Sequence, residues 1–98
     1  MRKITEQAAQ AFNNNQSFNN SNTSVEVSEE GTFLKLFGNT IAGKDSEGFW
    51  ISLAGYNTKT TKERLNGLDD VSIYTLKGQL QLNASNWDGK KIFLEINE

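Results

Sequence analysis

Apolar residues near the start of the chain recur at helical spacing, at Ile4, Ala8, Ala11 and Phe12. Residues three and four positions apart lie on one face of a helix, and alanine favours the helical state. Asparagine competes for backbone hydrogen bonds and tolerates the left-handed conformation of a helix cap. The pattern therefore predicts an N-terminal helix that ends in Asn13–Asn15.

Residues 13–24 form a polar segment in which six residues are asparagine. Phe18 is the one aromatic residue within this segment. Two interpretations of the segment stay open. It is either a polar surface loop held down by Phe18, or a recognition loop that becomes ordered when a partner binds.

From Thr23 onward, apolar and polar residues alternate, which is the pattern of half-exposed strands. Turn residues divide the region into four predicted strands, at residues 23–28, 32–37, 40–44 and 49–53. Leu34 and Leu36 point to one face of the second strand, because side chains alternate along a strand. Phe33 and Phe37 point to the other face. The fourth strand is apolar on both faces, so we expect it to be central.

Short turns connect these four strands, at Glu29–Gly31, Gly38–Asn39 and Asp45–Gly48. Glycine supplies the positive φ that such turns often need, and Gly38–Asn39 fits a two-residue hairpin loop. Consecutive strands joined by short turns pair antiparallel. The region is therefore predicted to be a β-meander.

A second, short helix is predicted at residues 60–66, after a loop at residues 54–58. Thr60 and Glu63 have the spacing of a capping box, and Gly67 is expected to end the helix. Alternating patterns then predict strands at residues 71–76, 79–82 and 90–96, with a turn at residues 83–89. The whole chain, residues 1–98, is predicted to be a single α+β domain. Its antiparallel meander sheet carries an N-terminal helix and one short helix between the fourth and fifth strands.

Composition narrows the chemistry that this domain can perform. The chain has no histidine and no cysteine, which excludes zinc sites of the usual kind, a cysteine nucleophile, a Ser–His dyad and disulfides. Adjacent acids occur at Glu29–Glu30 and Asp69–Asp70, but both pairs fall in predicted turns and are expected to be solvated. We therefore expect a binding protein without cofactor or metal, and not an enzyme.

Charge and hydropathy restrict the partners. The net charge is −2, which makes nucleic acid an unlikely partner, since nucleic-acid binders usually carry an excess of basic charge. No apolar run has the length of a membrane span, and the polar N-terminus does not resemble a signal peptide. These features predict a cytosolic protein with no membrane partner. The densest basic cluster is Lys59, Lys62 and Arg64.

The loop and helix around this basic cluster form the first candidate site. A helix N-terminus offers free N–H groups and a partial positive charge, which suit an anion. Tyr56 offers a stacking surface for a base, and hydroxyl, amide and guanidinium groups follow it. The candidate ligand-binding residues for a phosphate or nucleotide are Tyr56, Asn57, Thr58, Thr60, Thr61 and Arg64. The alternative is structural, with Thr60 as a helix cap, Leu65 and Leu68 in the core and Lys62 as solvated surface.

Aromatic residues form the second candidate site, because exposed aromatics often anchor protein interfaces. Trp50 lies in the predicted central strand and is expected in the core. Trp87 lies in a predicted turn, where it either covers one end of the sheet or serves as an exposed anchor. Trp87, Asp88 and Phe18 are the candidate protein-interaction residues.

The chain resembles small, poorly characterised accessory proteins of tailed bacteriophages. The likeness runs through most of the chain and is most distinctive in AGYNTKTTKERLNGL at residues 54–68, followed by YTLKGQLQLN at 74–83 and WDG at 87–89. Two positions depart from the pattern. The relatives favour Trp where Tyr56 stands, which preserves an aromatic group, and Gly where Ala84 stands, which puts the turn near Trp87 in question.

A phage origin implies a class of function. Small non-catalytic phage proteins often act by binding, so we expect an accessory protein that antagonises host antiviral defence stoichiometrically in the host cell cytoplasm. It would either occlude a host defence protein, with an aromatic patch and an acidic rim, or sequester a nucleotide second messenger. The alternatives are a nucleic-acid-binding protein of phage replication and a minor structural protein of the virion. Short edge strands also leave room for a homo-oligomer.

Overall fold

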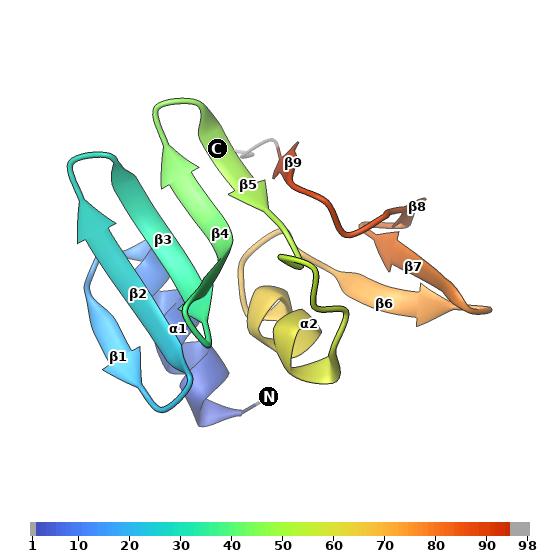
Figure 1. Cartoon of the computed structure of the whole chain (residues 1–98), viewed down its shortest axis with the longest axis horizontal. Coiled ribbons are helices and arrows are strands. Elements are labelled where there is room, and N and C mark those ends of the chain that lie inside the picture. The colour runs from blue at the N-terminus through green and yellow to red at the C-terminus, as the bar shows by residue number, and fades with distance from the viewer. Residues whose placement is uncertain (1, 95–98) are drawn as a thin grey trace.

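The computed structural model describes residues 2–94, which form two helices and two antiparallel sheets (Figure 1). The elements in chain order are α1 (Lys3–Asn13), β1 (Phe18–Asn20), β2 (Thr23–Ser28), β3 (Gly31–Leu36), β4 (Asn39–Asp45), β5 (Gly48–Ile51), α2 (Lys59–Asn66), β6 (Ile73–Leu76), β7 (Gln79–Leu82), β8 (Ser85–Asn86) and β9 (Ile92–Leu94). This arrangement confirms the predicted α+β class. Neither helix has the length and apolar content that crossing a membrane would require.

The large sheet has the strand order β1-β2-β3-β4-β5-β9. Its first five strands follow one another as a meander, of which the alternating pattern predicted the four strands β2–β5. The sixth strand, β9, pairs with β5 although residues 52–91 lie between them in the chain. Those intervening residues contain α2 and a separate small sheet, β6-β7-β8. The predicted final strand at residues 90–96 is found in part, because residues 95–98 lie outside the described range.

One face of the large sheet is covered by helix. Helix α1 lies behind β1, β2 and β3 in the view of Figure 1, and α2 packs beside α1 and contacts β4. The main core fills this side of the sheet; its most deeply buried large apolar residues are Phe12, Val25, Leu34, Ile41, Ile51 and Leu65. The opposite face of the large sheet carries no helix, and it is the face toward the viewer in Figure 1. We call these two sides the covered face and the open face.

The asparagine-rich segment does not form the loop expected for it. Phe18–Asn20 is strand β1, which pairs with β2 in the register Phe18↔Val25. Phe18 therefore lies on the covered face, half-buried against the core. The polar residues of this strand are tolerated because β1 is an edge strand, where side chains and backbone on the outer side remain hydrated.

Four hairpin turns use residues other than glycine at positive φ: the β1–β2, β3–β4, β6–β7 and β7–β8 turns. The predicted Gly38–Asn39 turn is displaced by one residue: Phe37 and Gly38 are the central pair, with φ of 51° and 80°. In the β7–β8 turn, Ala84 has a φ of 70°. Glycine adopts this conformation without steric cost, whereas an alanine at this φ is strained.

Candidate functional site

The first candidate site, around Tyr56 and α2, is organised by a helix cap that differs from the predicted one. The N-cap is Thr58, whose Oγ1 accepts a hydrogen bond from the Thr61 N–H at 3.2 Å. The hydroxyls of Thr58 and Thr61 also lie 2.9 Å apart. The expected capping box of Thr60 and Glu63 is therefore wrong, because the helix already begins at Lys59. Gly67 ends the helix as predicted.

Arg64 is placed inside the molecule, which contradicts the expectation that it faces a ligand at the surface. Its side chain is 2 % exposed. Nε donates to Thr23 Oγ1 at 3.0 Å, and one terminal nitrogen donates to Thr5 Oγ1 at 2.9 Å and to Glu63 Oε1 at 2.8 Å. The guanidinium thus joins α2 to β2 and α1. A buried arginine needs such partners, because desolvation of its charge is otherwise costly.

The six candidate ligand residues are consequently not brought together on one surface. Tyr56, Asn57 and Thr58 are exposed and Thr60 is half-buried. Thr61 and Arg64 are buried and are used in internal hydrogen bonds. Ligand binding by the exposed members stays a prediction, but without Arg64 the segment lacks the fixed charge proposed to hold a phosphate.

The second candidate group is also divided by burial. Trp87 is 6 % exposed and its indole N–H donates to the Lys90 carbonyl at 3.0 Å, so its interpretation as an exposed anchor is wrong. Trp87 packs in the main core together with Leu80 and Leu82 of β7, which precede it in the chain, and Leu94 of β9, which follows it. Asp88 is exposed, and its Oδ1 accepts the Lys90 N–H at 2.9 Å. Phe18, as described, is half-buried in β1.

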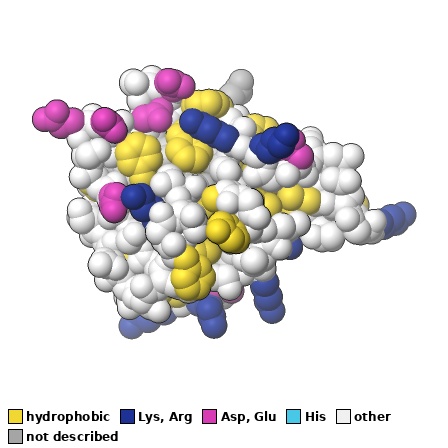
Figure 2. Space-filling view, viewed as in Figure 1, with side chains coloured by type: hydrophobic (Ala, Val, Ile, Leu, Met, Phe, Trp, Pro, Cys, Tyr) yellow, Lys and Arg dark blue, Asp and Glu magenta, His cyan; other side chains and the backbone are white. Residues whose placement is uncertain are grey.

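Aromatic side chains do gather on the open face of the large sheet, where sequence reasoning did not place a site. The strand register aligns four residues across β3, β4, β5 and β9, in the order Phe33, Gly43, Trp50 and Phe93. These positions alternate with the core-facing ones, so their side chains point away from the helices. We call Phe33, Trp50 and Phe93 the aromatic row. Figure 2 shows hydrophobic side chains gathered on the upper part of this face.

Gly43 explains how Trp50 can be almost fully buried, at 8 % exposed, on a face without helices. A Cβ atom at Gly43 would lie 2.6 Å from Cε2 of the indole, so the ring lies directly over this glycine. The indole N–H donates to Asp45 Oδ2 at 3.3 Å. The expected burial of Trp50 is confirmed, but Trp50 lies on the side of the sheet opposite the main core.

A lysine completes the cover over Trp50. Nζ of Lys91 lies 4.5 Å from the centroid of the Trp50 ring and 5.3 Å from that of Phe93. Ring faces carry negative charge density, which attracts a cation at such distances. Phe93 itself is 45 % exposed, and Phe33 is half-buried. The row is therefore accessible at both ends and capped by an ammonium group in the middle.

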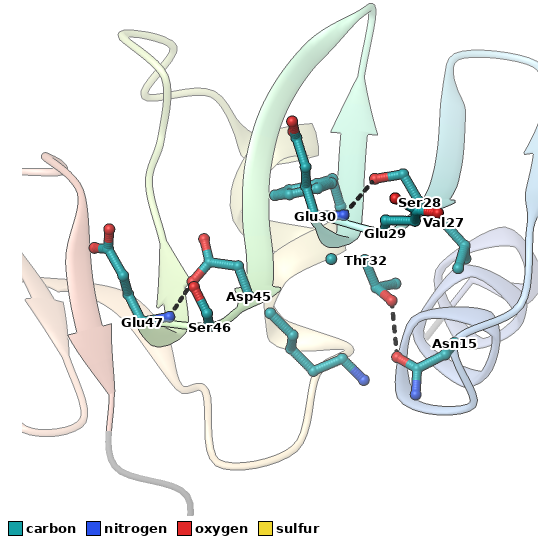
Figure 3. A pocket seen from close by; sticks show the side chains of 12 residues that line it. Asn15, Val27, Ser28, Glu29, Glu30, Thr32, Asp45, Ser46 and Glu47 are labelled. Carbon is teal, nitrogen blue, oxygen red and sulfur yellow. Dashed lines mark hydrogen bonds between the residues drawn. The ribbon is translucent and has the colours of Figure 1, made fainter.

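An acidic groove adjoins the Phe33 end of the row. It has a volume of about 780 Å³ and lies between the β2–β3 turn and the β4–β5 turn. Figure 3 shows Glu29 and Glu30 on one side of it, and Asp45 and Glu47 on the other. Phe33 is a member of the aromatic row and also lines this groove.

Lys44 is the one basic residue that lines the acidic groove. Its ammonium group is directed to the end of α1, where it donates to the Phe12 carbonyl at 2.6 Å. Burial lowers the pKa of this lysine below its usual value. The four carboxylates are therefore opposed by a cation that is already engaged by the backbone of α1.

Comparisons with known proteins identify the family of the chain. Neither curated proteins nor solved structures gave a match. A protein-family model described as Kyanoviridae Gp96 protein matches residues 1–95. This is a bacteriophage family and the match covers almost the whole chain, which confirms the phage origin that the resemblance implied. The chain therefore belongs to the Kyanoviridae Gp96 protein family.

Proposed function

We propose that this phage protein is a non-enzymatic binding protein that antagonises host antiviral defence by occluding a host defence protein. The open face of the large sheet is the proposed contact surface, and we place its action in the host cell cytoplasm. The observation that supports this proposal most is the aromatic row on a sheet face that carries no helix.

Aromatic side chains on a rigid sheet are suited to this role. They bury a large area with few rotatable bonds, and such residues dominate the binding energy of many interfaces. Phe93 is 45 % exposed, so it has surface left to lose when a partner covers it. Trp50 is held in place by Asp45 and Gly43, which reduces the entropy that binding would cost.

The other proposed mechanisms have less support. Sequestration of a nucleotide relied on Arg64, whose guanidinium is buried among Thr5, Thr23 and Glu63. Nucleic-acid binding would bring phosphates beside the acidic groove, where like charges repel. No observation on the described residues favours a structural role in the virion. Occlusion of a protein is therefore the function that we propose.

The test is native mass spectrometry of the protein isolated gently from infected cells, with two variants compared. Phe93→Ser removes an exposed member of the aromatic row. Leu76→Ser is the matched control, since Leu76 is 54 % exposed on the small sheet. We expect the wild type and Leu76→Ser to carry a host protein and Phe93→Ser to lose it.

The functional part of this test measures phage yield on a host that carries the defence system. Phage that encode Phe93→Ser should give a lower yield than phage that encode Leu76→Ser, if both variants unfold at similar temperatures. A bound small molecule, bound nucleic acid, or a chain found only in finished particles would each contradict the proposal.

A further inference from the structure

We propose that the host partner docks on the open face through a basic segment, and that this segment places a lysine or arginine side chain on the aromatic row. This inference rests on the proposed function and adds the chemistry of the partner. Three features of the described residues support it.

The first feature is that the row already holds a cation from its own chain. Lys91 places its ammonium group over the rings of Trp50 and Phe93, at 4.5 and 5.3 Å. Lys91 is exposed and lies in the segment that leads into β9. The contact demonstrates that the geometry of these rings suits an ammonium or guanidinium group. A partner's basic side chain would make the same kind of contact.

The second feature is the free end of the row. The cation–π contacts found among residues 2–94 involve Phe12, Trp50 and Phe93, and none involves Phe33. Phe33 is half-buried, so part of its ring remains available. It is the member of the row on which an incoming cation can lie without displacing Lys91.

The third feature is charge complementarity along the path from Phe33. The acidic groove begins at this residue and presents the carboxylates of Glu29, Glu30 and Glu47, beside that of Asp45, which accepts the Trp50 indole N–H. Lys44 is already bonded to the end of α1. A segment with one basic residue on Phe33 would bring its next basic residues against these carboxylates, whereas a phosphate backbone would be repelled.

Neighbouring charges do not reverse this preference. Glu26 stands beside Phe33 in the register, and its Oε2 lies 2.8 Å from Nζ of Lys35. This exposed pair is close to neutral as a unit. Lys91 adds one positive charge over Trp50 and Phe93, whereas at the Phe33 end the carboxylates of the groove outnumber Lys44, so the occupant favoured at that end is basic.

The probe for this inference is a short peptide of alternating arginine and serine, with a matched peptide that carries citrulline in place of arginine. A dye on the peptide reports binding to the full chain by fluorescence anisotropy. We expect the arginine peptide to bind, the citrulline peptide to bind much more weakly, and added salt to weaken the binding.

Two variants locate the bound peptide. Phe33→Leu removes the ring but keeps an apolar side chain, and we expect it to weaken binding by about threefold to tenfold. Glu6→Gln is the control for charge, because Glu6 is exposed in the first turn of α1, away from the open face. It should leave binding unchanged. Equal binding by Phe33→Leu and wild type would overturn the inference.

Two further results would overturn the inference of a basic partner segment but would leave the proposed function unaffected. One is single-stranded oligothymidylate binding more tightly than the arginine peptide. The other is a host protein that is captured in a Phe93-dependent manner but is not displaced by an excess of the arginine peptide. Failure to capture any host protein is the separate result that counts against the proposed function itself.

Discussion

The two faces of the large sheet each hold a basic side chain, and they hold it in different ways. On the covered face, Arg64 is 2 % exposed and bonded to two hydroxyls and one carboxylate. On the open face, Lys91 is exposed and lies over the rings of Trp50 and Phe93. The first cation is fixed by directional hydrogen bonds, and the second is held by a contact that another cation can reproduce.

Arg64 therefore has a structural role, whereas Lys91 makes a contact that a cation from a partner can also make. Loss of the covered cation would remove the donor to two buried hydroxyls and the counter-charge of Glu63, so the fold depends on it. Loss of the open cation would uncover aromatic surface without leaving such a group. We therefore expect removal of the covered cation to act on stability and removal of the open cation to act mainly on binding.

The largest effect is expected for Arg64→Leu. This change removes the charge and leaves the hydroxyls of Thr5 and Thr23 without their donor, so it should lower the free energy of unfolding by about 2–4 kcal/mol. Urea unfolding followed by circular dichroism would measure it. Lys59→Ala is the control, because Lys59 is exposed in the same helix. If both variants unfolded at the same urea concentration, the structural role of Arg64 would be refuted.

A pair of glycine substitutions, one on each side, should give an intermediate effect. A Cβ at Gly43 would lie 2.6 Å from the Trp50 ring, and a Cβ at Gly67 would lie 2.5 Å from Thr5 Cγ2. Forced displacement of packed side chains costs about 1–3 kcal/mol, so both alanine variants should be less stable.

Only the Gly43→Ala variant should change tryptophan fluorescence. The added methyl group would displace the Trp50 ring from Gly43 and expose it to the quencher acrylamide. Trp87 lies in the core, so we expect it to stay buried in both variants. Since these are the two tryptophans of the chain, their quenching reports the open face selectively. Unchanged quenching in Gly43→Ala would mean that the position of the Trp50 indole does not depend on the missing side chain at Gly43.

The smallest effect concerns Lys44 on the covered face and appears only in alkaline solution. Burial lowers its pKa in the folded protein below 10.5, so the unfolded chain binds more protons in the interval between the two values. The contribution of Lys44 to the free energy of unfolding must therefore rise with pH across that interval. The difference in unfolding free energy between wild type and Lys44→Gln, measured from about pH 8 to about pH 10.5, should grow in favour of wild type. A flat or falling difference would contradict the lowered pKa.

Local patterns in the sequence predicted the elements better than their partners. The meander strands β2–β5 follow from alternation and short turns, and α1 follows from its apolar spacing. Helix α2 was expected from a capping box that does not form, although Gly67 ends it as predicted. Strand β1 was missed because Asn19 and Asn20 disfavour strands, whereas tertiary pairing of Phe18 with Val25 favours one. The pairing of β9 with β5 was not predictable, since nothing local encodes which distant strand completes a sheet.

For the candidate sites too, local sequence patterns did not predict which residues lie together in the folded chain. Arg64 was grouped with Lys59 and Lys62 because all three are basic, but Thr61, Leu65 and Leu68 mark the buried side of this segment. That helical spacing was the signal that could have placed Arg64 inside. For the aromatic row, the sequence did put Phe33 opposite the core-facing leucines. Its alignment with Trp50 and Phe93 depends on the register across four strands, which requires the folded structure.

The late position of β9 also has a consequence for when the protein becomes active. A chain emerges from the ribosome from its N-terminus, and the meander β1–β5 needs only neighbouring segments to pair. Phe93 and Lys91 emerge after residues 52–90, so the nascent chain has Phe33 and Trp50 in place before the surface is finished. We expect the complete aromatic row, and with it the capture of a partner, to form only after β9 has been synthesised, later than the meander β1–β5.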